Sequence, residues 1–197
     1  RFQHGSNLYE IPEQEELARW LVNNSCADSV FFCNSGAEAN EAAIKLARKH
    51  GHQRQGIERP VILTAAASFH GRTLAAVSAT GQPRYHVGFE PMVEGFETFT
   101  YNDIHSFEQL LNRLEAHGPR VCAVLIEPLQ GEGGVNPGDP AVFRAMRRHC
   151  VERNILLIFD EVQVGMGRSG KLWGYEQLDV KPDVITLAKG LGGGHAI

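Results

Sequence analysis

The sequence predicts an α/β domain: a mostly parallel β-sheet with helices on both faces. Short apolar segments rich in β-branched residues alternate with longer segments in which apolar residues recur at helical spacing. The short segments are apolar at nearly every position, which is typical of strands buried on both faces. Strands that alternate with helices usually form parallel sheets with helical crossovers.

Five segments are predicted as strands because they are short, apolar and followed by polar or glycine-rich residues. They are residues 30–33, 61–64, 121–126, 155–159 and 184–187. Four segments with helical periodicity are residues 12–22, 37–50, 106–116 and 141–154. Ser106 and Asp139 are the expected N-caps, and Gly51 is expected to follow the end of the second helix. Residues 82–95 are expected to form an irregular surface segment.

Composition narrows the class of protein. The 197 residues are 43% hydrophobic, enough for a sizeable core. Lys and Arg number 19 against 23 Asp and Glu, a net charge of −4, which argues against binding to nucleic acid or anionic membranes. The four cysteines show no C-x-x-C spacing, so we expect a reduced, cytoplasmic protein without a zinc site.

Each predicted strand is followed by residues that can carry chemistry. Ligands of parallel sheets bind at the carboxyl ends of the strands, so we expect these residues to converge there. Lys189 follows an apolar strand and precedes a glycine-rich turn. Such enclosure would favour the neutral amine that condenses with carbonyl groups. A lysine that extends into solvent is an equally good interpretation.

Asp160 ends a fully apolar run, where a carboxylate needs a cationic partner such as a protonated pyridine nitrogen. Taken alone, it is more simply a cap of the following turn. Residues 34–37 precede a helix whose N-terminus could bind a phosphate, with Gly36 permitting close approach. Capping by Ser35 is the commoner role for such a segment.

Four further residues that follow strand ends have two interpretations each. Phe69 could stack on a flat cofactor or pack in the core. Arg72 could bind a carboxylate through two hydrogen bonds or be a surface charge. Glu127 and Glu132 flank a glycine-rich loop and could be site residues or loop charges. Together, these side chains are the set that a pyridoxal-phosphate enzyme acting on an amino acid requires.

A nucleotide-binding module is the alternative. Gly165, Gly167 and Gly170 match G-x-G-x-x-G and nearly match a P-loop. However, no helical pattern follows at once, and Leu172 stands where a P-loop has its magnesium-binding Ser or Thr. No catalytic or metal-ligand spacing includes His70, for which a helix-cap or packing role is expected.

The chain resembles the class III, fold type I pyridoxal-phosphate aminotransferases over nearly its whole length. The resemblance is carried by Lys189 and by four segments: residues 34–40 (NSGAEAN), 69–73 (FHGRT), 127–134 (EPLQGEGG) and 160–163 (DEVQ). It implies that residues 1–197 form the cofactor-binding large domain, as an internal fragment of a longer protein. An N-terminal segment and a C-terminal small domain are expected outside it.

The resemblance also implies roles for the residues around the cofactor ring. Lys189 would bond pyridoxal 5′-phosphate covalently and move the substrate proton. Asp160 would keep the pyridine nitrogen protonated. Phe69 and Val162 would pack on opposite faces of the ring, and Gln163 would donate to its phenolic oxygen.

Four other positions would contact the phosphate and the substrate. Gly36 and Ala37 would offer backbone N–H groups to the phosphate. Arg72 would bind the substrate carboxylate, and Glu132 would help the site to accept both substrates in turn. Glu38 and Asn40 are expected to be structural.

By the same resemblance, the expected reaction moves the δ-amino group of N-acetylornithine to 2-oxoglutarate, as in arginine biosynthesis. Ornithine and other ω-amino acids are the alternative donors. The full-length protein is expected to be a homodimer with no nucleic-acid or membrane partner. Because sites of this family lie at a dimer interface, the isolated chain is expected to fold without being active.

Overall fold

The computed structural model describes residues 8–117 and 120–195, and the chain divides into two compact units, Arg1–Phe32 and Cys33–Ile197. In the first unit, helix α1 (Pro12–Asn23) starts with proline in its first turn and buries Leu21. Residues 30–33 are irregular, so the predicted strand there is wrong. Phe31 is 72% exposed, which shows that this apolar run does not belong to a buried sheet.

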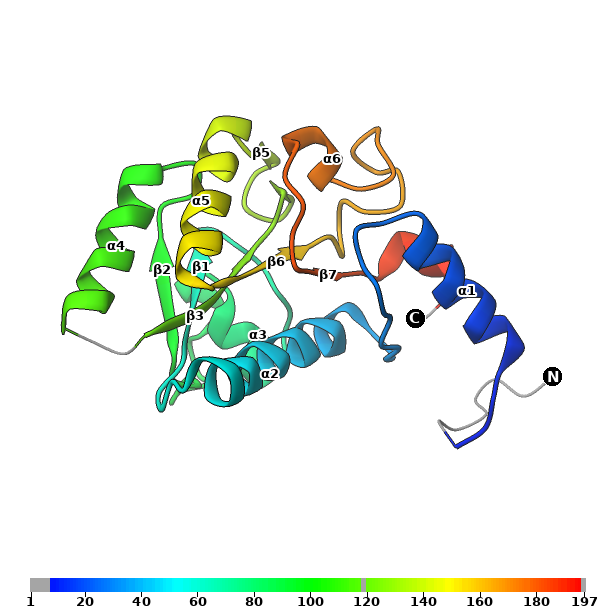
Figure 1. Ribbon diagram of the computed structural model, residues 1–197, viewed down its shortest axis with the longest axis horizontal. Helices are drawn as coiled ribbons and strands as arrows, with labels where there is room; N and C mark the ends of the chain where they lie inside the picture. Colours follow the sequence, from blue (N-terminus) through cyan, green and yellow to red (C-terminus); the bar gives the residue numbers. More distant parts are fainter. Residues whose placement is uncertain (1–7, 118–119, 196–197) are drawn as a thin grey trace. The chain divides into compact units, whose positions relative to one another are not determined.

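The second unit is built on a five-stranded sheet (Figure 1). All strand pairs are parallel, in the order β2-β1-β3-β6-β7, which confirms the predicted fold class. The strands are β1 (Val61–Ala65), β2 (Phe96–Phe99), β3 (Val121–Ile126), β6 (Leu156–Asp160) and β7 (Val184–Thr186). Strand β2 lacks the apolar pattern because it is a four-residue edge strand with Glu97 at its second position.

Helices cover both faces of this sheet, as Figure 1 shows. Helix α2 (Gly36–Gln55) packs Ile44 and its neighbours against one face, where Ile158 of β6 is buried. The next residue, Phe159, points to the opposite face because strand side chains alternate. There it meets Phe143 of helix α5 (Pro140–Arg153), with ring centroids 5.6 Å apart. Helix α4 (Ile104–His117) covers the same side, since its Phe107 contacts Phe99 of β2.

Two of the predicted helix boundaries need correction. Gly51 lies inside α2, where a Cβ atom would come within 2.9 Å of the Cβ of Cys122. This glycine therefore lets α2 approach β3 closely, and Gly56, with φ of 64°, ends the helix instead. Ser106 is not the cap of α4, because Asp103 accepts the Ser106 N–H at 3.0 Å. The predicted cap Asp139 is confirmed by its hydrogen bond with the Ala141 N–H.

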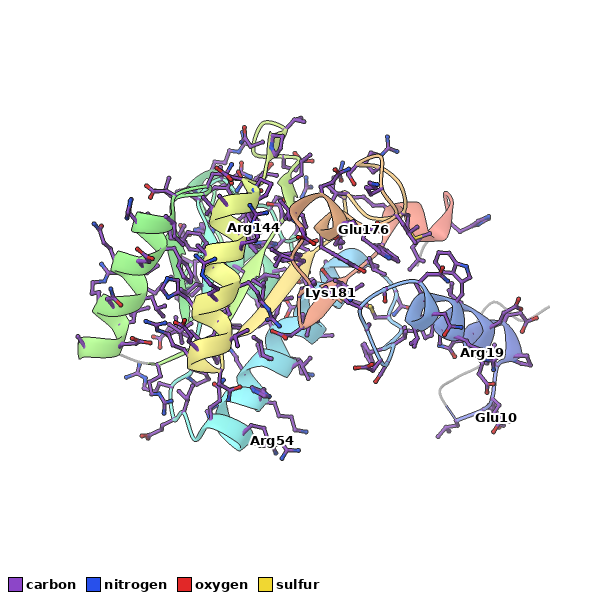
Figure 2. The ribbon with its side chains drawn as sticks, turned by 45° about the horizontal axis from the view of Figure 1, so that its top comes forward. Glu10, Arg19, Arg54, Arg144, Glu176 and Lys181 are labelled. Carbon is purple, nitrogen blue, oxygen red and sulfur yellow. The ribbon has the colours of Figure 1, made fainter. Side chains whose placement is uncertain are left out.

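The remaining elements are short and lie between the strands. They are α3 (Leu74–Ala79), the 3₁₀ turn η1 (Pro83–Tyr85), the hairpin of β4 (Leu129–Gln130) and β5 (Asn136–Pro137), α6 (Tyr175–Leu178), and the 3₁₀ turn η2 (Lys189–Gly192). Residues 82–95 are irregular outside η1, as predicted. Charged side chains such as Arg54, Arg144 and Lys181 are exposed (Figure 2). Within residues 8–117 and 120–195, no helix is long and apolar enough to cross a membrane.

Candidate active site

A cavity of about 450 Å³ lies in the second unit, lined by residues that follow β1, β3, β6 and β7. Its volume is in the usual range for small-molecule sites. All nine site residues expected from the sequence line this cavity. They are Gly36, Ala37, Phe69, Arg72, Glu132, Asp160, Val162, Gln163 and Lys189. The parallel topology thus brings together residues that are up to 153 positions apart (189 − 36).

Asp160 is the most constrained of these residues. It is the last residue of β6 and is only 4% exposed. Its Oδ2 lies 2.8 Å from both the Asn40 side-chain nitrogen and Nδ1 of His70. Its Oδ1 accepts the Val162 N–H at 3.1 Å, so the turn-capping interpretation also holds. These partners compensate the burial of the carboxyl group and fix its orientation.

Asn40 and His70 have a larger part in the site than the sequence indicated. Both are buried, line the cavity and contact Asp160. The Asn40 amide also donates to the His70 carbonyl at 2.7 Å, and its oxygen accepts the Thr186 hydroxyl at 2.7 Å. The helical spacing could have identified Asn40, because it lies one turn beyond Gly36 on the same face of α2.

Lys189 lies on the cavity wall, and of the two interpretations open from the sequence, an enclosed amine or a lysine extending into solvent, the structure shows the second. Its side chain is exposed, like those of the other four lysines, and its amine donates to Oε1 of Gln163. The apolar residues before it pack into the sheet, whereas Lys189 itself begins η2 with φ of 47°. Few residues other than glycine adopt this conformation. Its position on the cavity, and not its burial, distinguishes it from the other lysines.

The N-terminus of α2 forms another wall of the cavity. Ser35 caps the helix by accepting the Glu38 N–H at 3.2 Å, and Glu38 accepts the Asn34 N–H at 2.7 Å. Gly36 and Ala37 are in the first turn, where backbone N–H groups have no intrahelical acceptor. A Cβ atom on Gly36 would come within 2.6 Å of Val162 Cγ1, so only glycine permits this contact. Free N–H groups and the helix dipole suit this wall to an anion.

Phe69 follows β1 and presents a half-buried ring. Its ring packs edge-on against Tyr85, with centroids 5.4 Å apart. The Phe69 N–H donates to Oε2 of Glu127 at 3.2 Å. Burial raises the pKa of Glu127 to about 7, so this residue is a buried site group and not a loop charge. Arg72 and Glu132 line the cavity with exposed side chains.

The structure does not support the nucleotide-binding alternative. Residues 165–170 form successive turns, and the next helix, α6, has four residues and begins only at Tyr175. A pyrophosphate site needs a helix N-terminus directly after the glycines. No group of three or more His, Cys, Asp or Glu side chains suited to a metal ion occurs within residues 8–117 and 120–195.

An amine, a buried carboxylate, an aromatic ring and a helix N-terminus suited to an anion lie around one cavity, and pyridoxal-phosphate enzymes that act on amino acids use groups of these kinds. The entire chain, residues 1–197, matches the family described as aminotransferase class-III. The chain therefore belongs to the class III aminotransferases, a pyridoxal-phosphate-dependent family whose substrates are amino acids and keto acids.

Similar proteins come from bacteria and from a protozoan. The chain is 78% identical to acetylornithine aminotransferase of Parasynechococcus marenigrum over 197 residues, which are 100% of this chain and 47% of that protein. It is 63% identical to the Nostoc enzyme of the same name, over 100% of this chain and 46% of that one. The chain spans about half the length of these relatives.

Solved structures show the same fold. N-acetylornithine aminotransferase from Stenotrophomonas maltophilia superposes with a TM-score of 0.80 at 39% identity, over 98% of this chain and 46% of that one. Ornithine aminotransferase from Toxoplasma gondii gives a TM-score of 0.89 at 31% identity, over 96% of this chain and 44% of that one. The latter structure is described as having partial occupancy of pyridoxal phosphate at its active site.

Proposed function

We propose that this chain is the cofactor-binding large domain, residues 1–197, of an enzyme that transfers the δ-amino group of N-acetylornithine to 2-oxoglutarate. The products are the corresponding semialdehyde and glutamate, in arginine biosynthesis. The observation that carries this proposal is the convergence of nine motif residues on one cavity. The choice of donor rests on relatives that are 63–78% identical and are named acetylornithine aminotransferase.

The cavity fits pyridoxal 5′-phosphate. Asp160 is a buried carboxylate with a fixed orientation, suited to hold a proton on the ring nitrogen. Gly36 and Ala37 would donate backbone hydrogen bonds to the phosphate. Phe69 and Val162 would contact the two ring faces. The ring, when bound, withdraws electrons from the bond that breaks at the substrate Cα.

The other side chains would handle the covalent attachment, the substrate and its proton. Lys189 has an accessible amine that would bond the cofactor and then carry the proton to and from the substrate Cα. Gln163 orients this amine and would donate to the phenolic oxygen of the cofactor. Arg72 offers two parallel donors for the substrate carboxylate. Glu132, in the same region of the site, would help it to accept first one substrate and then the other.

Ornithine or another ω-amino acid is the alternative donor, because ornithine aminotransferase also shares this fold. The test is the first half-reaction of the full-length protein, in which the amino donor converts the cofactor to its amine form. N-acetylornithine should react at a higher kcat/KM than ornithine or 4-aminobutyrate. A higher value for ornithine would contradict the proposed substrate.

We propose that the full-length protein is a cytoplasmic homodimer. Leu74, Val87 and Phe89 in the second unit are 65%, 73% and 62% exposed, which supports a partner surface. All four cysteines are free, as suits a reducing compartment. Analytical ultracentrifugation of the full-length protein should give twice the subunit mass. The isolated chain is expected to be folded but inactive, because it would lack the partner's contribution to the site.

A further inference from the structure

Glu127 is a buried carboxyl group on the cavity wall to which the proposed function gives no role. It follows β3 directly and is 5% exposed. Its Oε2 accepts the Phe69 N–H at 3.2 Å. Its backbone oxygen accepts the Tyr101 hydroxyl at 3.0 Å, which fixes the main chain at this point. Glu127 therefore joins the end of β3 to the residue whose ring lines the cavity.

The segment that carries Phe69 is attached to the segment after β3 at a second point. The Gln130 amide donates to the Ala66 carbonyl at 2.8 Å. Of these two connections, only the one through Glu127 contains an ionisable group. The strength of the hydrogen bond on the Phe69 N–H itself thus depends on the protonation of one carboxyl group. An ionised acceptor forms a hydrogen bond about twice as strong as a neutral one.

The groups around Glu127 place its ionisation near neutral pH. Burial is the main cause that raises its pKa to about 7, and the negative charge of Asp160 adds to this effect. His70 and the N–H groups of Phe69 and Gly131 oppose it, because each favours the carboxylate. The Tyr101 hydroxyl also faces Glu127, and burial raises the pKa of that phenol, so it remains a neutral donor.

We propose that Glu127 is a positioning residue for Phe69: its carboxylate holds the Phe69 backbone at the cavity wall, and protonation weakens that hold. The consequence for the cofactor rests on the proposed function, in which the Phe69 ring contacts the pyridine ring. Cofactor binding is then coupled to a proton that neither the cofactor nor Lys189 carries.

The primary test needs no cofactor. The unmodified chain is prepared with ¹⁵N-phenylalanine, which labels ten residues, and the Phe69 amide is identified by its loss in Phe69→Tyr. Its chemical shift should move between pH 6 and pH 8 with a midpoint near 7. In Glu127→Gln this movement should disappear. Movement that persists in Glu127→Gln would come from another group, such as His70, and would overturn the proposal.

Glu161→Gln is the matched control. Glu161 is also buried after a strand end, and burial likewise raises its pKa to about 7, but its carboxyl oxygens accept the N–H groups of Gly174 and Tyr175. In Glu161→Gln, the chemical shift of the Phe69 amide should still move between pH 6 and pH 8 as it does in the unmodified chain. If Glu127→Gln does not fold, the carboxyl carbon of Glu127 in the unmodified chain decides. Its ¹³C shift and the Phe69 amide must share one midpoint, and different midpoints would overturn the proposal.

The second readout is the affinity for pyridoxal phosphate. Between pH 8 and pH 6, the unmodified chain should lose affinity by roughly threefold more than Glu127→Gln does. Equal pH dependence in the two proteins contradicts a positioning role. The two hypotheses fail separately. Absence of cofactor binding in the full-length protein would refute the proposed function, whereas the amide titration alone decides the link between Glu127 and Phe69.

Discussion

Nδ1 of His70 lies 2.8 Å from Oδ2 of Asp160, and both side chains are buried. The contact joins the segment after β1 to the last residue of β6, 90 positions further along the chain. Asn40 of α2 reaches the same oxygen at 2.8 Å. Two side chains from separate segments thus fix one carboxylate oxygen of a third, which is the preorganisation that a charge-stabilising group requires.

Replacing His70 tests this arrangement. His70→Ala removes a partner of a buried carboxyl group and should destabilise the chain by about 1–3 kcal/mol. It should also weaken cofactor binding, because Asp160 is then held by fewer groups. Urea unfolding and cofactor titration measure the two effects. His105→Ala, at a side chain that is 86% exposed, is the control and should change neither. Unchanged stability in His70→Ala would mean that the contact is unimportant.

Gly36→Ala should disturb the cavity more than the addition of a single methyl group suggests. The added Cβ would lie 2.6 Å from Val162 Cγ1, so either the helix terminus or Val162 must move. We expect a loss of cofactor affinity of roughly tenfold or more, because the phosphate and ring contacts both depend on this wall. Gly51→Ala is matched to it, since it also overpacks α2, but against Cys122. It should reduce stability without a specific effect on binding.

The stability of the chain should fall as pH rises from about 4.5 to 7. Burial raises the pKa of Glu161 from 4.5 to about 7, so the folded state binds a proton that the unfolded state has already released in this window. Its contribution is complete below pH 4.5 and is lost as pH rises through 7. The slope is at most ~1.4 kcal/mol per pH unit for one group.

Urea unfolding of the unmodified chain and of Glu161→Gln, between pH 5 and pH 8, measures this slope. The free energy of unfolding of Glu161→Gln should change less with pH than that of the unmodified chain. The pH dependence that remains in the variant is assigned to Glu127, whose pKa is also raised to about 7. Glu58→Gln, at an exposed position, should retain the full slope. Identical slopes in Glu161→Gln and in the unmodified chain would show that Glu161 is ionised throughout.

Arg72→Lys should separate charge from geometry in substrate binding. Lysine keeps the positive charge but lacks the two parallel donors of the guanidinium group. In the full-length protein we expect KM for both carboxylate substrates to rise roughly tenfold to hundredfold, with a smaller change in kcat. Arg144→Lys, on the exposed side of α5, serves as the control (Figure 2). A normal KM in Arg72→Lys would exclude a bidentate contact.

Buried strands and periodic helices were predictable because their signal is local. The apolar runs that became β3 and β6 are in the centre of the sheet, where each face needs apolar side chains. The run at residues 30–33 has similar composition but lacks a sheet to join, a fact that no local pattern contains. Edge strand β2 could not be predicted from its composition, which mixes apolar and polar residues. It forms a strand because it pairs with β1, and the local sequence does not contain that pairing.

The site was predictable as a set of residue types, but not in its electrostatics. Strand-end positions indicated most of the nine residues that line the cavity, and the resemblance to a family added Val162 and Gln163 and the individual roles. The buried contacts of His70, Asn40 and Glu127 join residues that are 30 or more positions apart in the chain, and the exposure of Lys189 likewise depends on tertiary packing. Local signals existed for two of these residues: Asn40 lies one helical turn beyond Gly36, and His70 is adjacent to Phe69. Neither signal contains the contact with Asp160.

The most direct test of the account is to locate the covalent attachment of the cofactor. The chain is incubated with pyridoxal phosphate, reduced with borohydride, and digested for peptide mapping. The label should be on Lys189 and should be absent from Lys189→Ala, while Lys181→Ala, at an exposed position near β7, keeps it. A label that is distributed over the exposed lysines, or that persists in Lys189→Ala, would contradict the assignment of this cavity as the cofactor site.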